Sequence, residues 1–432
     1  KIQDDLEKDL DYSIKKSFRR LNRFDFAQVN RDILGDVYQG YLPSDERKRL
    51  GEFYTPKEII EYILDAVGYK PENEIRGKKI LDPACGSGSF LVEATRRLIE
   101  GYRRISFNLK DPDDAKQVIQ GCISSIYGLD IHPFACFIAE MNLLFQFVDL
   151  YDVVRQKEGD YKLPRLNIYR TDSLAPVGLS IELTAFLDNS RQKMFIEETK
   201  GADIVKGIEF DYVVGNPPYV RIQRLPKDVI KYYKNYDCAL GKFDIFILFI
   251  EHGIKMLKQN GKLGFICSNQ FIYRDYGRKI RRFILENCSI VQILDFGDSG
   301  VFKEVTNYPC ILILGKRKIK DNVFKNMRVL EPAADLLVNI KKFLNKKEYY
   351  EQNYEIFEVN QSKLDENVWK LMPRSEALVI KKIKGEATDL LKDICERIYE
   401  GFITGANKIY FWNEEDIKRH DIERDLLRPV PK

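Results

Sequence analysis

Short apolar runs alternate with helix-like patterns between residues 51 and 325, and this alternation predicts the fold. The segments between the runs carry apolar residues at helical spacing, as in Ile59, Ile63 and Val67. The runs themselves are short and end at polar or acidic residues, which is typical of buried parallel strands. These predicted strands lie at residues 78–82, 126–130, 168–172, 210–215, 261–266 and 310–314. Strands that alternate with helices predict an α/β fold with a doubly wound, Rossmann-like sheet.

The segments on either side of this region have a different pattern. Residues 1–50 are charged, and their apolar residues recur at helical spacing, so we predict a helical lead-in. Residues 326–392 are rich in Lys and Glu with few strand signals, which predicts a connecting region that is mostly helical. We therefore expect the sheet, and a ligand site at its edge, to lie within residues 51–325.

The strand predicted at residues 210–215 ends in the sequence Asn216-Pro217-Pro218-Tyr219, where two prolines prevent it from continuing. The carboxyl ends of strands are where open α/β sheets place their ligand sites. There the Asn216 side-chain oxygen and the Pro217 backbone carbonyl can accept both hydrogens of a planar exocyclic amine. The Tyr219 ring can stack on the ring that carries this amine. Taken alone, the four residues also fit a proline-rich turn.

A second motif makes the functional interpretation stronger. The strand at residues 78–82 ends at Asp82, and the turn Pro83-Ala84-Cys85-Gly86-Ser87-Gly88 leads into a predicted helix. Glycines allow positive φ and a close approach of the backbone to a ligand, and the helix presents free N–H groups.

Together the two motifs resemble the gamma class of DNA adenine-N6 methyltransferases in restriction–modification systems. The resemblance implies S-adenosyl-L-methionine as cofactor, double-stranded DNA as substrate, and methylation of an adenine that is flipped out of the duplex. Residues 391–407 resemble the opening of this family's specificity domain, so we expect residues 393–432 to hold a truncated start of one. A separate or fused specificity region and a nuclease are the further partners that the resemblance implies.

The resemblance also assigns roles to individual residues. It implies that Asn216, Pro217, Pro218 and Tyr219 are catalytic, together with Phe302 as a second aromatic residue against the flipped base and Tyr308 in reserve. It implies that Asp130 accepts from ribose hydroxyls and Asp172 from the adenine amino group of the cofactor. The complete set of implied cofactor-binding residues is Tyr54, Thr55, Asp82, Pro83, Ala84, Cys85, Gly86, Gly88, Asp130, Ile131, Asp172, Ser173, Asn216 and Pro218.

Several of these residues also fit purely structural roles. Asp82 and Asp130 suit acids that cap strand-to-helix turns, and Thr55 suits a helix N-cap. Phe302 also suits a plain core position. At the level of function, N4-methylation of cytosine in DNA, methylation of a protein glutamine or of RNA by the same chemistry, and a cofactor-binding but non-catalytic fragment stay open.

Composition adds little to this interpretation. Lys and Arg number 70 and Asp and Glu 66, so the net charge of +4 does not itself indicate a nucleic-acid partner. Basic clusters at residues 15–20, 278–282 and 316–320 are either phosphate contacts or ordinary solvated surface. The eight cysteines form no C-x-x-C pair and no His stands at ligand spacing, so we expect neither disulfides nor a metal site. No segment is predicted to span a membrane, and we expect a cytoplasmic protein.

Overall fold

The computed structural model describes residues 55–105, 107–175, 205, 207–297, 308–330, 349–350 and 353–387. The chain divides into two units, Lys1–Pro373 and Arg374–Lys432. The predicted helical lead-in and the predicted start of a specificity domain both lie outside the described residues.

The strands are β1 (Ile80–Asp82), β2 (Ile126–Asp130), β3 (Asn167–Arg170), β4 (Phe210–Gly215), β5 (Leu257–Ser268), β6 (Ser289–Asp295), β7 (Pro309–Gly315), β8 (Val323–Val329), β9 (Tyr349–Tyr350) and β10 (Tyr354–Asn360). The α-helices are α4 (Lys57–Val67), α5 (Ser89–Arg103), α6 (Pro112–Ser125), α7 (Pro133–Lys157), α10 (Lys227–Tyr233), α11 (Phe246–Met256), α12 (Gln270–Tyr273), α13 (Arg278–Asn287) and, in the second unit, α15 (Arg374–Glu386). Short 3-10 helices are η2 (Ile222–Arg224), η3 (Asp275–Gly277) and η5 (Gln361–Lys363).

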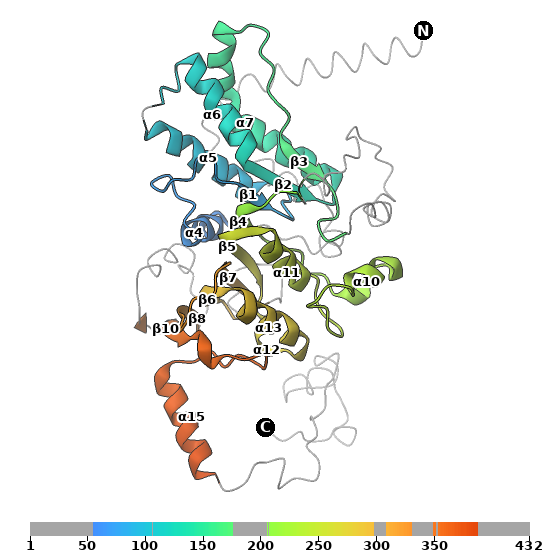
Figure 1. Ribbon diagram of the computed structural model, residues 1–432, viewed down its shortest axis with the longest axis vertical. Coiled ribbons are helices and arrows are strands. Elements are labelled where there is room, and N and C mark those ends of the chain that lie inside the picture. Colours follow the sequence, from blue (N-terminus) through green and yellow to red (C-terminus); the bar gives the residue numbers. More distant parts are fainter. Residues whose placement is uncertain are drawn as a thin grey trace, which may run out of the picture. The chain divides into compact units, whose positions relative to one another are not determined.

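The described strands form one ten-stranded sheet in the order β3-β2-β1-β4-β5-β7-β6-β8-β10-β9 (Figure 1). Strands β3, β2, β1, β4 and β5 are parallel, and β7 runs antiparallel between β5 and β6. The strand order reverses between β1 and β4. At such a reversal an open α/β sheet leaves a crevice at the carboxyl ends of its strands.

Successive side chains of each strand point to opposite faces, so the sheet separates two hydrophobic cores. Ile80 of β1 lies in the first core, which also holds residues of α4, α5, α6 and α7. Its neighbour Leu81 lies in the second core, with residues of α10, α11 and α13 (Figure 1). Every residue of β1 and β2 is buried, as expected for parallel strands that are covered on both faces. The predicted doubly wound α/β sheet is confirmed.

Residues 326–392, predicted as a mostly helical connection, also contain strands of the sheet. β8 pairs in parallel with β6, and β10 pairs antiparallel with β8, with Tyr354 opposite Val329. In β10 the buried Tyr354 and Ile356 flank the partly exposed Glu355. A strand with one polar side mixes charged residues into its sequence, and this weakened the strand signal.

Helix α7 is an exception to the expectation that no segment could span a membrane. It is long and apolar enough to do so by length and composition. However, it contacts α5, α6, β2 and β3, and it buries Leu143, Phe147 and Val154 in the first core. These contacts are those of a core helix.

Candidate active site

The carboxyl ends of four neighbouring strands bring predicted site residues together. Asp82 ends β1, Asp130 ends β2, and Asp172 follows β3. Asn216 directly follows β4, the strand paired with β1. All three acids are buried, with 1%, 7% and 4% of their surface exposed. The predicted side chains therefore meet at the reversal of strand order.

The glycine-rich turn after β1 is held by backbone hydrogen bonds. The Cys85 N–H donates to the Leu129 carbonyl of β2 at 2.9 Å, and the Gly88 N–H donates to the Cys85 carbonyl at 2.8 Å. Gly88 has a φ of +86°, and a Cβ on it would lie 3.0 Å from the Ala139 Cβ of α7. Glycine is therefore required at Gly88 both for its conformation and for the approach of α7.

Asp130 joins the turns that follow β1 and β2. Its Oδ2 accepts from the Gly86 N–H at 2.9 Å, and its Oδ1 accepts from the His132 N–H at 2.8 Å. Burial raises the pKa of this carboxyl group above its usual range. A carboxylate has about four acceptor positions, so Asp130 keeps capacity for a ligand hydroxyl while it holds both turns.

Asp82 lies against the glycine that precedes Asn216. A Cβ on Gly215 would come within 2.5 Å of the Asp82 Oδ1, and Gly215 has a φ of +153°. The same oxygen accepts from the Ala84 N–H at 3.1 Å. Burial is the largest cause that raises the pKa of Asp82 to about 8, and the nearby Asp130 carboxyl group adds to it. Gly215 thus allows the ends of β1 and β4 to approach closely.

The carboxylate of Asp172 already has partners within the chain. Tyr233 of α10 donates its hydroxyl toward both carboxylate oxygens, at 3.0 and 2.9 Å, and the Leu174 N–H donates at 2.9 Å. Tyr236 donates to the Leu174 carbonyl at 2.9 Å. Sequence reasoning missed these tyrosines, although residues 232–236 are rich in aromatic side chains and follow the Asn216 motif closely.

Asn216 contacts the turn that precedes α4. Its Nδ2 donates to the Thr55 Oγ1 at 3.2 Å, and Thr55 is 6% exposed. Thr55 is not the N-cap of α4, because Pro56 takes that position and no side-chain capping hydrogen bond is formed there. Two segments far apart in the sequence, predicted separately as site residues, are therefore in direct contact.

The half-buried Tyr219 lies beside an aromatic series that belongs to the second core. Its ring centroid is 6.4 Å from that of Phe246 in α11, and the Phe246 ring is 6.4 Å from that of Phe271 in α12. Burial raises the pKa of the Tyr219 hydroxyl well above its usual range, so this side chain stays neutral. A neutral, supported ring is suited to stacking.

The other predicted site residues either lie outside the described residues or make fewer contacts. Tyr54 and Phe302 lie outside the described residues. Tyr308, the reserve aromatic, is 42% exposed at the start of β7, and its carbonyl accepts from the Asn269 N–H at 2.8 Å. The remaining predicted residues lie in the turns already described or beside them: Pro83, Ala84, Ile131, Ser173, Pro217 and Pro218. Among these, Ser173 donates its hydroxyl to the Pro83 carbonyl.

The chemistry of this edge fits S-adenosylmethionine. The amino and hydroxyl groups of that molecule are donors, and the edge offers the oxygens of buried carboxyl groups as acceptors. A Cβ on Gly86 would meet nothing within 4 Å, so the turn is open to a ligand. The Thr171 hydroxyl, 2% exposed beside Asp172, makes no hydrogen bond within the described residues. Such a buried polar atom is expected to find a partner in a ligand or water.

Comparison with known proteins agrees with this geometry. Residues 124–302 match the family described as Eco57I restriction-modification methylase. The chain is 25% identical over 387 residues to the type II methyltransferase M.BstVI of Geobacillus stearothermophilus, covering 88% of this chain and 62% of that protein. It is 27% identical over 467 residues to the type II restriction enzyme and methyltransferase RM.Eco57I of Escherichia coli, covering 94% and 43%. It is also 27% identical over 327 residues to the adenine-specific methyltransferase PglX of Streptomyces coelicolor, covering 70% and 26%.

The chain therefore spans less than two thirds of these relatives' own length. Among solved structures, a modification subunit of a putative type I restriction enzyme from Vibrio vulnificus aligns with a TM-score of 0.52 and 17% identity, over 82% of this chain and 67% of that one. The type ISP restriction-modification enzyme LlaBIII bound to DNA aligns with a TM-score of 0.51 and 17% identity, over 72% and 22%. The resemblance seen in the two motifs is confirmed: the chain is similar in sequence to type II and adenine-specific methyltransferases, and it has the α/β fold of these solved restriction–modification proteins.

Proposed function

We propose that this chain transfers the methyl group of S-adenosylmethionine to the N6 amino group of an adenine flipped out of DNA, as the modification part of a restriction–modification system. The observation that carries the proposal is the position of Asn216, which follows β4 beside Asp82 and is held by Thr55. The name of one relative, the adenine-specific methyltransferase PglX, supports adenine as the target.

The cofactor would lie across the ends of β1, β2 and β3. When bound, S-adenosylmethionine supplies an electrophilic methyl group on a sulfonium sulfur. Asp130 would accept from ribose hydroxyls, and its bonds to the Gly86 and His132 N–H groups fix its orientation. Asp172 would accept from the adenine amino group, alongside the hydroxyl of Tyr233. The open backbone at Gly86 would allow close contact with the ligand.

Asn216 would prepare the target amine for attack. The lone pair of the adenine amino group is delocalised into the ring, so the group is a weak nucleophile. If the Asn216 Oδ1 and the Pro217 carbonyl accept its two hydrogens, the nitrogen becomes more tetrahedral and its lone pair is restored. Acceptors fixed in advance stabilise the positive charge that develops on nitrogen in the transition state. Thr55 orients the amide, because Asn216 donates to it through Nδ2 and so presents Oδ1 as the acceptor.

Tyr219 would support the base outside the duplex. An aromatic ring stacked on an unpaired base contributes about 1–3 kcal/mol. The contact of Tyr219 with Phe246 restricts the ring, so little conformational freedom is lost when the base binds. Phe302 remains our proposed second aromatic side chain.

The test combines cofactor binding with methyl transfer. S-adenosylmethionine is titrated by calorimetry into the wild-type chain, Asn216→Ala and Asp130→Ala. Each protein is also incubated with tritiated S-adenosylmethionine and plasmid DNA from a host without adenine methylation. We expect Asn216→Ala to lower label transfer by about 10²–10³-fold, the range for loss of a group that acts in the transition state, with cofactor affinity near wild type. We expect Asp130→Ala to lose cofactor affinity.

The products distinguish the alternatives. Nucleoside analysis showing N6-methyladenine supports the proposal, whereas N4-methylcytosine, or label in protein or RNA, would replace it with another acceptor. Cofactor binding without any methylated product would favour a non-catalytic fragment. Loss of cofactor binding in Asn216→Ala would make Asn216 a structural residue and contradict its assigned role.

A further inference from the structure

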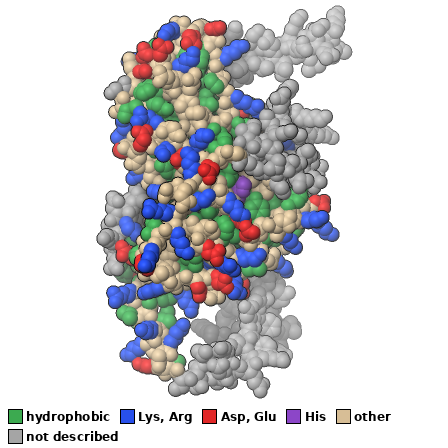
Figure 2. Space-filling view, in the orientation of Figure 1, with side chains coloured by type: hydrophobic (Ala, Val, Ile, Leu, Met, Phe, Trp, Pro, Cys, Tyr) green, Lys and Arg blue, Asp and Glu red, His purple; other side chains and the backbone are tan. Residues whose placement is uncertain are grey.

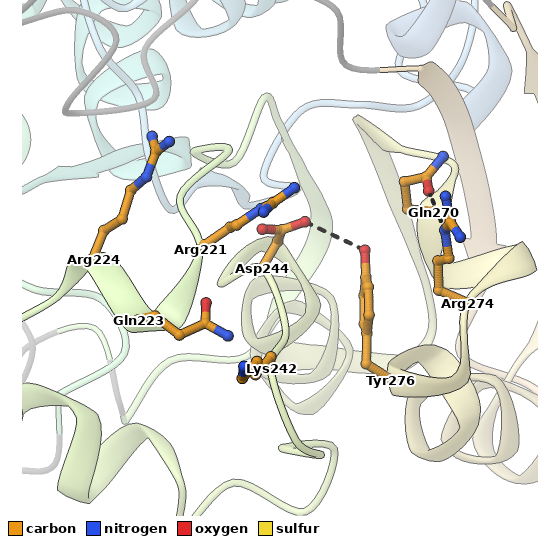
Figure 3. A pocket seen from close by; sticks show the side chains of 8 residues that line it. All are labelled: Arg221, Gln223, Arg224, Lys242, Asp244, Gln270, Arg274 and Tyr276. Atoms are coloured by element: carbon orange, nitrogen blue, oxygen red, sulfur yellow. Dashed lines mark hydrogen bonds between the residues drawn. The ribbon is translucent and has the colours of Figure 1, made fainter. Parts of the chain in front are cut away.

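A pocket of about 580 Å³ opens where the chain leaves the Asn216–Tyr219 motif. Its lining contains four cations, Arg221, Arg224, Lys242 and Arg274, against a single acid, Asp244 (Figure 3). On the face that Figure 2 shows, Lys and Arg are interspersed with Asp and Glu. The pocket is therefore a local excess of positive charge in a chain with little net charge.

Backbone hydrogen bonds connect the walls of the pocket to the segment that follows the Asn216–Tyr219 motif. The Ile245 N–H donates to the Val220 carbonyl and the Ile222 N–H donates to the Phe243 carbonyl, both at 2.9 Å. These bonds fix Arg221, which follows the motif by two residues, beside Asp244. The opposite wall begins at Gln270, next to Phe271 in the aromatic series beside Tyr219. The cations are therefore held close to the place proposed for the flipped base.

The cations of the pocket are available to a ligand. Arg221, Arg224 and Lys242 are exposed, and in the described part of the chain their side chains form no hydrogen bond or ion pair. In Figure 3, Arg221 lies between Arg224 on one side of the view and Arg274 on the other. Arg274 uses its Nε to donate to Gln270 at 2.9 Å, which leaves its terminal nitrogens for other acceptors. The Asp244 carboxylate is partly occupied by the Tyr276 hydroxyl at 3.3 Å.

The other basic clusters do not share these properties. Arg281 is 1% exposed and donates to backbone carbonyls, and Arg278 and Arg282 pair with Glu366 and Glu286. Residues 316–320 follow Gly315 at the end of β7, which runs antiparallel to β5 and β6, and the Lys316 ammonium donates to the Leu257 carbonyl at the start of β5. They therefore lie at the sheet edge opposite Asn216. The cluster at residues 15–20 lies outside the described residues.

We propose that this pocket binds backbone phosphates of the DNA strand that carries the flipped adenine, an inference that rests on the proposed function. The phosphates flanking a flipped nucleotide are covalently attached to it, so they must lie near the base-stacking Tyr219. A guanidinium group can donate two hydrogen bonds at once to the oxygens of one phosphate. The lysine ammonium group adds a further positive charge. Phosphate contacts of this kind fix the position of the strand without reading its sequence.

The experiment measures DNA binding by the full chain as a function of salt. The probe is a fluorescein-labelled duplex in which one adenine faces an abasic site, because an unpaired base flips at little cost. Its dissociation constant is determined by fluorescence anisotropy at several KCl concentrations. The variants are Arg221→Gln, Lys242→Gln and Asp244→Asn, and Lys320→Gln is a charge-matched control at the opposite edge.

We expect Arg221→Gln and Lys242→Gln each to raise the dissociation constant about fivefold at low salt. Each should also reduce the magnitude of the slope of log association constant against log KCl concentration by about one. Asp244→Asn removes a negative charge and keeps an acceptor for Tyr276, so it should bind DNA more tightly than wild type. Damage to the fold would not produce this opposite sign. Lys320→Gln should match wild type.

Each contrary outcome contradicts a specific part of the proposal. If wild type does not bind the duplex, the DNA substrate and the pocket assignment are both overturned. If wild type binds but the pocket variants behave like Lys320→Gln, the pocket assignment alone is overturned. Displacement of the duplex by micromolar inorganic phosphate at constant ionic strength would assign the pocket to free phosphate instead.

Discussion

At the scale of single residues, the strand-end acids combine structural and ligand-binding capacity. The sequence of Asp130 and its neighbours is compatible with two roles, a turn-capping acid or a cofactor acceptor, and the structure shows the first without removing the second. Both of its oxygens accept backbone N–H groups, which is the geometry that would hold them ready for a ribose. Local capping and ligand binding are therefore compatible at this position.

Asp82 gives a prediction about pH and stability. Its pKa is raised to about 8, chiefly by burial, whereas an unfolded Asp has a pKa of about 3.9. Between these values the folded protein keeps a proton that the unfolded chain has lost, so the contribution of Asp82 to stability is greatest below about pH 4 and falls as the pH rises toward 8. Urea unfolding from about pH 5 to about pH 8 should show a loss of a few kcal/mol in wild type.

The control for this prediction is Asp82→Asn. The amide is neutral at every pH and can still accept from the Ala84 N–H. We expect a smaller loss of stability across the same pH range, with a remaining part from Asp130, whose pKa is also raised. An equal loss in wild type and Asp82→Asn would show that Asp82 is ionised in the folded protein.

At the scale of elements, the sequence predicted those features that depend on local pattern. The strand, turn and helix around Asp82 and Gly88 could be predicted because apolar runs and glycines act over a few residues. The contact between Tyr233 of α10 and Asp172 could not, because the two residues are 61 positions apart and no periodicity connects them. The contact of Asn216 with Thr55 could be inferred only through the family's shared motifs.

The packing of the glycine-rich turn against α7 can be tested by comparing two glycines. In Gly88→Ala, the new Cβ would meet the Ala139 Cβ at 3.0 Å and its Cα at 3.1 Å, and φ is +86°. In Gly86→Ala, φ is +53° but no atom lies within 4 Å of the new Cβ. We expect Gly86→Ala to lose about 1 kcal/mol of unfolding free energy and Gly88→Ala about 2–4 kcal/mol, measured by urea without cofactor. Equal losses would mean that α7 moves away without cost.

At the scale of the whole molecule, the sheet extends beyond the boundary predicted at residue 325. The second core runs along the sequence from Leu81 of β1 to Leu371, and it includes Trp369, which is 1% exposed. Trp369 donates its ring N–H to the Asp365 carbonyl at 2.8 Å, and its ring lies 6.1 Å from that of Phe271. The charged composition of this segment concealed its role, since a few buried side chains decide whether it belongs to the core.

Replacement of Trp369 tests whether these late residues belong to the catalytic unit. Trp369→Ala should lower the unfolding free energy by about 3–5 kcal/mol, because a large side chain leaves a cavity beside Phe271. Trp369→Phe keeps an aromatic ring and loses one hydrogen bond, so it should lose about 1–2 kcal/mol. Cofactor affinity is measured by calorimetry under conditions where both variants are folded. It should stay near wild type, because the cofactor-binding residues Asp82 and Asp130 lie at the ends of β1 and β2, and Trp369 is in neither strand. Near-wild-type stability of Trp369→Ala would separate residues 354–371 from the core and restore the boundary predicted from the sequence.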